Sequence, residues 1–402
     1  MGRFYGAEAS SGKLTLVITV MAILTIIGNF GIKDALQKLI PESNVKHNQA
    51  TTTKYYLLGL KNIFLIWFVV GSIFWFLAPV LCKAWNAPEL LSFFRISILF
   101  VLPTILGDYN YFSLRAALKI NTANISILIP SVIRIVILIV VTIYFFNIDN
   151  PIYLHWATLS ILPFLFSIYP IYKNFFKSDR IVEHTYIPKS AEIYRLAIPM
   201  LLTYSAFMIN NYADVFMLKF YNVSTAAVGV YKTANNISML TATLLVALNT
   251  TVQPKITQLY YQSELDEVRK VSQKSTKLIF WLSLPITLLL IFIAKPIMSI
   301  YGKEFMIGAF SLAVLSIGQL FNTACGPVAQ LLNGIGFHKQ FTIISIIGAI
   351  INIVINLILI PLYGINGAAI ASTISIFSWN IIGSFFIKKK LGFYIAFIPF
   401  KK

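Results

Sequence analysis

Long runs of uncharged, apolar residues recur along this chain, and they constrain its fold more than any other feature of the sequence. The hydrocarbon core of a bilayer is about 30 Å thick, so a helix that rises about 1.5 Å per residue crosses it with about 20 apolar residues. Eleven segments come close to this length or exceed it, and their approximate bounds are Leu14–Ile32, Leu57–Leu81, Leu91–Gly107, Ala123–Phe146, Ile152–Tyr172, Leu196–Leu218, Ala226–Thr251, Leu278–Ile300, Ile307–Leu331, Gln340–Ile360 and Gly367–Ile387. The sequence therefore predicts an all-α polytopic membrane protein with about eleven transmembrane helices.

The charged residues indicate how these spans are oriented. They make up only 11% of the chain, against about a quarter in soluble domains, which excludes a soluble globular protein. Of the 32 Lys and Arg residues, 23 fall on the loops and flanks of one side of the predicted membrane and six on the other. Cytoplasmic loops are enriched in Lys and Arg, so we expect a cytoplasmic C-terminus and an external N-terminus. The remaining three bases, Arg95, Arg134 and Lys232, lie within predicted spans.

The first residues of the chain read like a loop that follows a helix. Met1–Gly6 leads from the outside into the first span, and that span has no signal-peptide cleavage site after it. We therefore expect that the first helix of an N-terminal half is missing. The alternative is a true eleven-span protein that translocates a short N-terminal segment.

The two halves of the sequence contain corresponding motifs at nearly constant spacing. Gly12 and Pro41 flank a span in the first half, and Gly229 and Pro254 flank a span in the second, 217 and 213 residues further on. Another pair of motifs, before the fourth and the tenth spans, is separated by 218 residues. These offsets predict two homologous halves with the same orientation.

The polar segment Lys173–Arg195 separates these halves. We predict an N-terminal helical bundle of five spans in residues 1–190 and a C-terminal helical bundle of six spans in residues 191–402. Transporters built from such repeats bind their substrate between the two halves and alternate access by moving one against the other.

Several motifs, in this order and spacing, resemble a known family. They are Gly2–Ala9, Ile27–Ile32 with Asp34–Leu36 and Ile40–Pro41, Val228–Tyr231, Leu332–Gly336 and Ile360–Ala371. Together they resemble the polysaccharide transporter branch of the multidrug/oligosaccharidyl-lipid/polysaccharide exporter superfamily, the O-antigen flippase type, over nearly the whole chain. The departure from that family is the missing first helix, which lines the central cavity there.

The resemblance implies a MATE-like flippase fold of two pseudo-symmetric bundles, here with five and six spans. It implies a flippase of the bacterial cytoplasmic (inner) membrane that translocates a lipid-linked oligosaccharide or polysaccharide repeat unit by alternating access, for cell-surface polysaccharide biosynthesis. The expected partners are a glycan on an undecaprenyl-pyrophosphate type carrier, membrane lipids, and glycan polymerase or assembly proteins. We expect no nucleic-acid partner and no cofactor.

Two other functions remain open. The first is an ion-coupled multidrug or small-molecule exporter of the same superfamily. The second and weaker one is a polytopic glycan polymerase or glycosyltransferase, which needs acids, bases or diphosphate-binding loops at the membrane face. The outer connections are short with few carboxylates, and the cytoplasmic segments contain no paired acidic motif. We therefore predict a membrane transporter and not an enzyme.

Arg134 is the leading candidate for substrate binding, because it lies near the middle of the fourth span. A cation at that depth costs at least about 2.5 kcal/mol on insertion scales unless it meets water or a partner. Its guanidinium suits an anionic group such as a lipid pyrophosphate. The alternative is a structural hydrogen bond to backbone carbonyls or polar side chains of packed helices.

Asp214 is a clear acidic residue within the spans, near the outer end of the sixth. Asn210 and Asn211 precede it by four and three residues, so the three side chains share one face of a helix. We predict that this face lines the substrate cavity, and that Asp214 is a candidate ion-coupling site for a proton or sodium.

A second polar stripe of the predicted cavity comprises Lys232, Asn235 and Asn236 in the seventh span, with Arg95 of the third span as a further cation. The alternative is a structural Asp214–Lys232 pair, with amides joining the helices. We interpret the other in-span amides, including Asn352 and Asn356, as packing groups.

The sequence predicts no metal site. The four His residues are scattered without ligand spacing, and the two Cys residues lie at opposite sides of the predicted membrane. No ATP-binding motif occurs, because the glycines near Lys13 lack the spacing and the Ser or Thr of a phosphate loop. The energy source is therefore expected to be an ion gradient or substrate flux.

Overall fold

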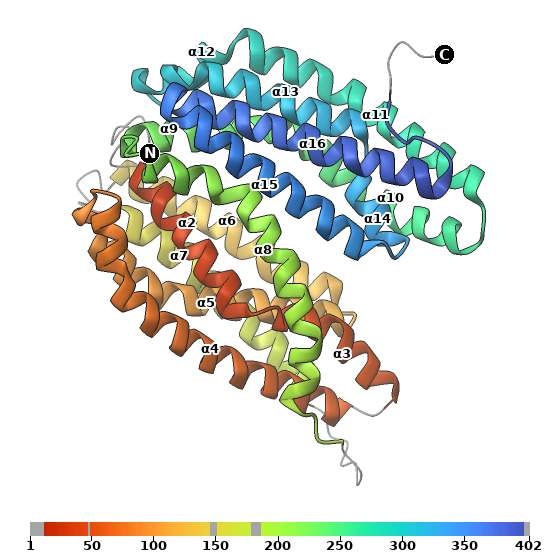
Figure 1. Cartoon of the computed structure of the whole chain (residues 1–402). Coiled ribbons are helices and arrows are strands. Elements are labelled where there is room, and N and C mark those ends of the chain that lie inside the picture. Colours follow the sequence, from red (N-terminus) through yellow and green to blue (C-terminus); the bar gives the residue numbers. More distant parts are fainter. Residues whose placement is uncertain (1–11, 47–48, 145–150, 178–185, 398–402) are drawn as a thin grey trace. The chain divides into compact units, whose positions relative to one another are not determined.

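The computed structural model describes residues 12–46, 49–144, 151–177 and 186–397, and these segments are almost entirely helical (Figure 1). The described residues form helices joined by short turns, with no strand among them. The all-α class predicted from the apolar runs is therefore confirmed.

Packing divides the chain into two compact units. The N-terminal unit comprises residues 17–205, and the C-terminal unit comprises residues 206–402 together with residues 1–16. Two helices continue from one unit into the other, α2 (Lys13–Asn29) and α8 (Ser190–Phe220).

The N-terminal unit is built around α5. Its helices after α2 are α3 (Ile32–Lys46), α4 (Gln49–Ala84), the short η2 (Pro88–Leu90), α5 (Leu91–Ala116), α6 (Ile120–Tyr144), α7 (Pro151–Ile171) and the short η3 (Tyr172–Phe176). Helix α5 packs against α3, α4, α6 and α7. Phe94, Val101 and Ile105 are buried along α5 at helical spacing, which explains why this helix is central.

The C-terminal unit contains the remaining helices. They are α9 (Thr225–Ser238), α10 (Leu240–Tyr261), α11 (Leu265–Phe292), α12 (Ala294–Ser299), η4 (Lys303–Gly308), α13 (Ala309–Cys325), α14 (Val328–Gly334), α15 (His338–Tyr363) and α16 (Ile365–Leu391). Helix α16 lies beside α15 (Figure 1), and it also packs against α13. Helix α13 in turn contacts α9 and α11.

Seven helices in the described part of the chain are long and apolar enough to cross a membrane, or eight if the bent pair α2 and α3 is one span. The protein is therefore a multi-pass membrane protein. The predicted number of eleven spans is not confirmed by this count.

Three predicted spans are interrupted in the described part of the structure. Ala226–Thr251 is divided between α9 and α10, Leu278–Ile300 between α11 and α12, and Ile307–Leu331 between α13 and α14. Helix α13 ends at Cys325, Gly326 has a φ of +78°, and α14 begins at Val328. Pro327 has no N–H to donate and disfavours a helical conformation in the residue before it, so the helix ends there.

Helices α2 and α3 are bent by 41° at the glycine-containing motif noted in the sequence. Phe30 and Gly31 have φ values of +48° and +72° at the bend. A Cβ at Gly31 would clash with the backbone oxygen of Ala197 on α8. Glycine is therefore required both for the backbone conformation and for the close approach of α8.

Gly31→Ala is expected to lower the free energy of unfolding by about 3 kcal/mol, because the positive φ and a clash with a backbone carbonyl add. Thermal unfolding of the purified protein, followed by tryptophan emission, measures this. Gly392→Ala is the matched control. Gly392 has a φ of +83°, but nothing lies within 4 Å of its Cβ position. Gly392→Ala should therefore lower the free energy of unfolding by only about 1 kcal/mol. Equal losses in the two variants would contradict the close approach.

Candidate functional site

A buried polar cluster in the C-terminal unit surrounds Asp214 of α8, which is 3% exposed. Tyr231 on α9 donates a hydrogen bond from Oη to Asp214 Oδ2 at 2.5 Å, and the Ser372 hydroxyl on α16 donates to the same oxygen. Asn356 on α15 donates from Nδ2 to Asp214 Oδ1 at 2.7 Å and to Asn352 Oδ1 at 3.0 Å. We call these five residues the Asp214 cluster.

Close packing of α15 and α16 makes this cluster possible. Asn352 and Asn356 are one turn apart on α15, so both amides point to the same side. The two helices are joined at Gly364, whose φ of +55° permits a tight turn. Further along, Ser375 Oγ of α16 donates a hydrogen bond to the backbone oxygen of Gly348 at 2.8 Å, so side chain and backbone meet directly.

The Asp214 cluster has the chemistry of a site for a proton or a small cation. Three donors, from Tyr231, Ser372 and Asn356, stabilise the charge of a carboxylate in a low-dielectric environment. Asn356 Oδ1 is buried and has no hydrogen-bond partner among the described residues. Carboxylate, amide and hydroxyl oxygens are the ligands that hard cations prefer. The described residues contain no group of three or more His, Cys, Asp or Glu side chains that could hold a metal ion.

Lys232 lies next to Tyr231 on α9 but does not pair with Asp214. Its ammonium nitrogen lies 5.2 Å from the centre of the Tyr212 ring, and the described part of the chain contains no Asp214–Lys232 ion pair. The structural pair considered as an alternative is therefore not observed. Asp214 is instead satisfied by neutral donors.

The other polar residues predicted near Asp214 differ in how deeply they are buried. Asn211 and Asn235 are half-buried, and Asn236 is exposed. The side chain of Asn210 lies outside the described residues. Of the residues singled out in the sequence for the cavity, only Asp214 belongs to the Asp214 cluster.

Arg134 and Arg95 belong to the N-terminal unit. Arg134, on α6, is half-buried, and its Nε is buried without a hydrogen-bond partner among the described residues. Arg95, on α5, lies with its guanidinium carbon 4.8 Å from the centre of the Trp75 ring. Neither arginine forms an ion pair with a carboxylate in the described part of the chain.

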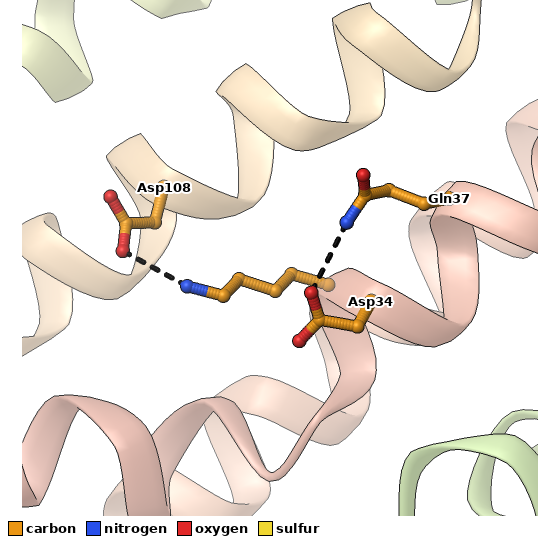
Figure 2. Close-up of polar contacts among 4 residues, drawn as sticks. Asp34, Gln37 and Asp108 are labelled. Carbon is orange, nitrogen blue, oxygen red and sulfur yellow. Dashed lines mark hydrogen bonds and ion pairs between the residues drawn. The ribbon is translucent and has the colours of Figure 1, made fainter. Parts of the chain in front are cut away.

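An ion pair holds α3 to α5 just beyond the bend. Lys33 Nζ lies 3.3 Å from Asp108 Oδ2 and 4.9 Å from the centre of the Phe112 ring. On α3, Gln37 donates from Nε2 to Asp34 Oδ1 at 3.1 Å (Figure 2). Figure 2 shows Asp108 on the neighbouring helix, opposite the side chains of α3. We interpret this group as structural, because Lys33 neutralises Asp108 and joins two helices of one unit.

The N-terminal unit also contains a cavity of about 510 Å³ where α3, α4 and α8 meet. Its described lining residues are Lys38, Leu39, Glu42, Ser43, Tyr55, Tyr186, Glu192, Arg195 and Leu196. We call it the α3–α8 cavity. All of these residues lie within residues 17–205, so the cavity is formed by one unit.

Glu192, near the start of α8 and ahead of the predicted span, is held by three donors in the cavity wall. Tyr55 Oη donates at 2.5 Å, Tyr186 Oη at 2.8 Å and the backbone nitrogen of Lys189 at 3.0 Å. Burial alone would raise the pKa of Glu192, but the hydrogen bonds from Tyr55, Tyr186 and the Lys189 backbone, together with the charge of Lys189, outweigh burial and lower it. Glu192 is therefore charged at neutral pH, and its charge is satisfied within the wall.

The cations of the α3–α8 cavity are available to a ligand. Lys38 and Arg195 are exposed, and neither forms an ion pair with a carboxylate of the described residues. Two bases, Lys38 and Arg195, and two acids, Glu42 and Glu192, line the cavity. The ammonium and the guanidinium suit the anionic part of a ligand, such as the phosphate of a phosphorylated sugar. The sequence interpretation missed this cavity, because it assigned both residues to loop charge. The available signal was Glu192, one of only 14 acidic residues, placed three residues before Arg195.

The architecture is that of known membrane transporters. The structure of an inward-facing multidrug resistance MATE transporter has a TM-score of 0.79 at 15% identity, over 96% of this chain and 92% of that one. The inward closed lipid II flippase MurJ has a TM-score of 0.76 at 19% identity, over 96% and 83%. At these identities the likeness shows the fold.

Two relatives from Haloferax volcanii match parts of the chain. The probable flippase AglR is 29% identical over 178 residues, 44% of this chain and 37% of that protein. The probable low-salt glycan biosynthesis flippase Agl15 is 30% identical over 152 residues, 37% of this chain and 32% of that protein. The matched region thus spans about a third of the length of each relative.

These findings define the class as a helical, multi-pass membrane protein with a transporter fold. The chain belongs to the polysaccharide biosynthesis protein family, whose family model matches residues 7–260. The MatE family model matches residues 199–358. The resemblance inferred from the motifs is confirmed.

Proposed function

We propose that this protein is a flippase that translocates a lipid-linked oligosaccharide or polysaccharide repeat unit, and that it is not an enzyme of glycan synthesis. The match of residues 7–260 to the polysaccharide biosynthesis family carries this proposal. The names of AglR and Agl15 as probable flippases support it, as does the fold shared with the lipid II flippase MurJ.

The α3–α8 cavity supplies a first binding site for the anionic head of such a substrate. Lys38 and Arg195 pair with phosphate oxygens, and the hydroxyl-rich wall accepts sugar hydroxyl groups. Arg134 provides a third cation on the substrate path. Lys232, Asn235 and Asn236, with Asn210 and Asn211, contact the glycan through hydrogen bonds.

The Asp214 cluster couples transport to an ion gradient. A proton or a small cation bound at Asp214 changes the charge of a site buried among four helices of the C-terminal unit. Such a change biases the helices between two arrangements, because the bound and the empty carboxylate favour different donors.

The proposal includes the placement of the chain in the cell. The C-terminus lies in the cytoplasm and the observed N-terminus outside, in a bacterial cytoplasmic membrane, as the distribution of basic residues predicts. The sequence divides near residue 190 into two homologous halves, with five and six spans. The carrier lipid is of the undecaprenyl-pyrophosphate type, and glycan polymerase or assembly proteins receive the product.

A reconstituted flipping assay tests this function. The protein is placed in proteoliposomes with a fluorescent lipid-linked oligosaccharide, and an added reductant bleaches the fluorophores of the outer leaflet. We expect complete bleaching with the protein and about half without it, because only translocation exposes the inner pool. Bleaching equal to that of empty liposomes would refute the proposal.

The second candidate function is ion-coupled export of a small molecule. The MatE match over residues 199–358 favours it, because that segment contains the whole Asp214 cluster apart from Ser372. The same liposomes distinguish the two functions. A drug exporter concentrates an organic cation such as ethidium when an ion gradient is applied, whereas a flippase leaves it at equilibrium.

Arg195→Ala is expected to weaken binding of a soluble prenyl diphosphate about tenfold, because it removes a charge-assisted hydrogen bond. Isothermal titration calorimetry of the detergent-solubilised protein measures this. Lys61→Ala removes an exposed cation of α4 that does not line the cavity, and it should leave the affinity unchanged. A similar loss in both variants would mean that net charge, and not the cavity, sets the affinity.

A further inference from the structure

A groove of about 270 Å³ runs between α4 and α5 in the N-terminal unit. It shares no described lining residue with the α3–α8 cavity. One wall consists of aromatic side chains of α4, including Trp67, Trp75 and Phe76. The other wall belongs to α5 and contains Arg95. The groove therefore combines an apolar surface with a single cation.

Small side chains and one hydrogen bond keep the floor of the groove narrow. A Cβ at Gly71 of α4 would lie 2.9 Å from Ile98 Cγ2 on α5, so glycine lets the helices approach. Trp67 Nε1 donates a hydrogen bond to the backbone oxygen of Ile98 at 3.1 Å. The two helices are thus fixed to each other below the aromatic rim, and the groove is a formed feature of the unit.

Arg95 is held in position but retains hydrogen-bonding capacity. Its guanidinium carbon lies 4.8 Å from the centre of the Trp75 ring, which orients the planar group by a cation–π contact. Its Nε is buried without a hydrogen-bond partner among the described residues, and no carboxylate there forms an ion pair with it. Its remaining N–H groups can serve a planar, anionic partner.

The groove opens to the outer surface of the helical bundle. Phe68 and Phe76 on α4 are 68% and 76% exposed, so the outer rim of the groove is apolar. Arg95 is the fifth residue of α5, about 6 Å along the helix from its start. A position this close to the end of a spanning helix is expected to lie at the border between hydrocarbon and headgroups, where an arginine reaches lipid phosphates.

We propose that the α4–α5 groove is a binding site for an anionic membrane phospholipid. The phosphate pairs with Arg95, and one acyl chain lies along Phe68 and Phe76. Charge complementarity selects this occupant, because the groove contains one cation and no Asp or Glu among its described lining residues. A zwitterionic lipid would place its amine where no acid receives it, whereas phosphatidylglycerol has no such group.

Quenching of tryptophan fluorescence by brominated lipids tests the proposal, because Trp67 and Trp75 lie in the groove. The full chain carries Trp281→Phe and Trp379→Phe, so that the other remaining tryptophans, Trp85 and Trp156, are buried. It is reconstituted in phosphatidylcholine vesicles with a minor share of brominated phosphatidylglycerol or brominated phosphatidylcholine. We expect an apparent preference of about fivefold for phosphatidylglycerol at the groove.

Arg95→Gln is expected to remove this preference, and Arg95→Lys to retain part of it, because the lysine keeps the charge but loses the fork. Lys83→Gln, which removes an exposed cation in the last turn of α4, should leave the preference intact. Full preference in Arg95→Gln, or an equal loss in Lys83→Gln, would overturn the site.

A third probe separates this site from the proposed transport function. A brominated polyprenyl diphosphate that displaces phosphatidylglycerol from the groove would show that the carrier lipid is the occupant, and the phospholipid proposal would be wrong. The flipping assay reports the proposed function independently, because it measures translocation, whereas tryptophan quenching measures lipid preference at the groove. The preference of Arg95→Lys also separates loss of binding from loss of folding.

Discussion

Asp214→Asn is expected to reduce ion-driven glycan translocation to the background of empty liposomes while the protein remains folded. Asparagine keeps the shape and one carbonyl oxygen, and the hydroxyls of Tyr231 and Ser372 can rotate to accept from its amide. What is lost is the negative charge that a proton or a cation neutralises. The measurement is the flipping rate with and without an applied ion gradient, together with thermal unfolding.

Two controls sharpen this prediction. Tyr231→Phe removes one donor and keeps the carboxylate, so we expect a partial decrease in rate and a loss of stability of about 1 kcal/mol. Ser316→Ala alters a buried hydroxyl of α13 that donates to the backbone of its own helix, and it should leave the rate unchanged. A gradient-dependent rate in Asp214→Asn equal to the unmodified protein would rule out the coupling role.

Arg134→Ala is expected to abolish glycan export while the protein still inserts into the membrane. Removal of an intramembrane cation favours insertion by about 2.5 kcal/mol, so loss of export cannot follow from poor insertion. Arg134→Lys should retain a small part of the rate, because an ammonium replaces the planar fork by a point charge. Flipping in proteoliposomes, normalised to the inserted protein, measures the effect.

Arg115→Ala provides the matched control for Arg134. Arg115 is an exposed arginine in the last turn of α5, where it lies over the ring of Tyr111. We expect export by Arg115→Ala to stay near the unmodified level. Normal export by Arg134→Ala would mean that this arginine is a packing group.

The sequence predicted the fold class because hydrophobic runs of bilayer length have few other solutions. It identified Asp214 for a similar reason, since an acid within a span is costly and therefore conspicuous. Its partners were not predictable. Ser372 and Asn356 are 158 and 142 residues away in the chain, and only the packing of α15 against α16 brings them to the carboxylate.

The α3–α8 cavity shows a second limit of sequence interpretation. Arg195 and Lys38 belong to segments whose bases fit a topology signal, so their charge had an adequate explanation without a site. The hydrogen bond from Tyr55 to Glu192 joins residues that are 137 positions apart in the chain. No local periodicity encodes such a contact, so the cavity appears only in the folded structure.

The α3–α8 cavity has all its described walls in one compact unit, and this limits its role in transport. A motion that displaces rigid units against each other leaves such walls unchanged, so the affinity for a ligand there stays the same before and after the motion. A ligand that binds two states equally does not shift their populations. In the proposed mechanism, the cavity therefore raises the local concentration of substrate, and the free energy that drives the transition enters at another site.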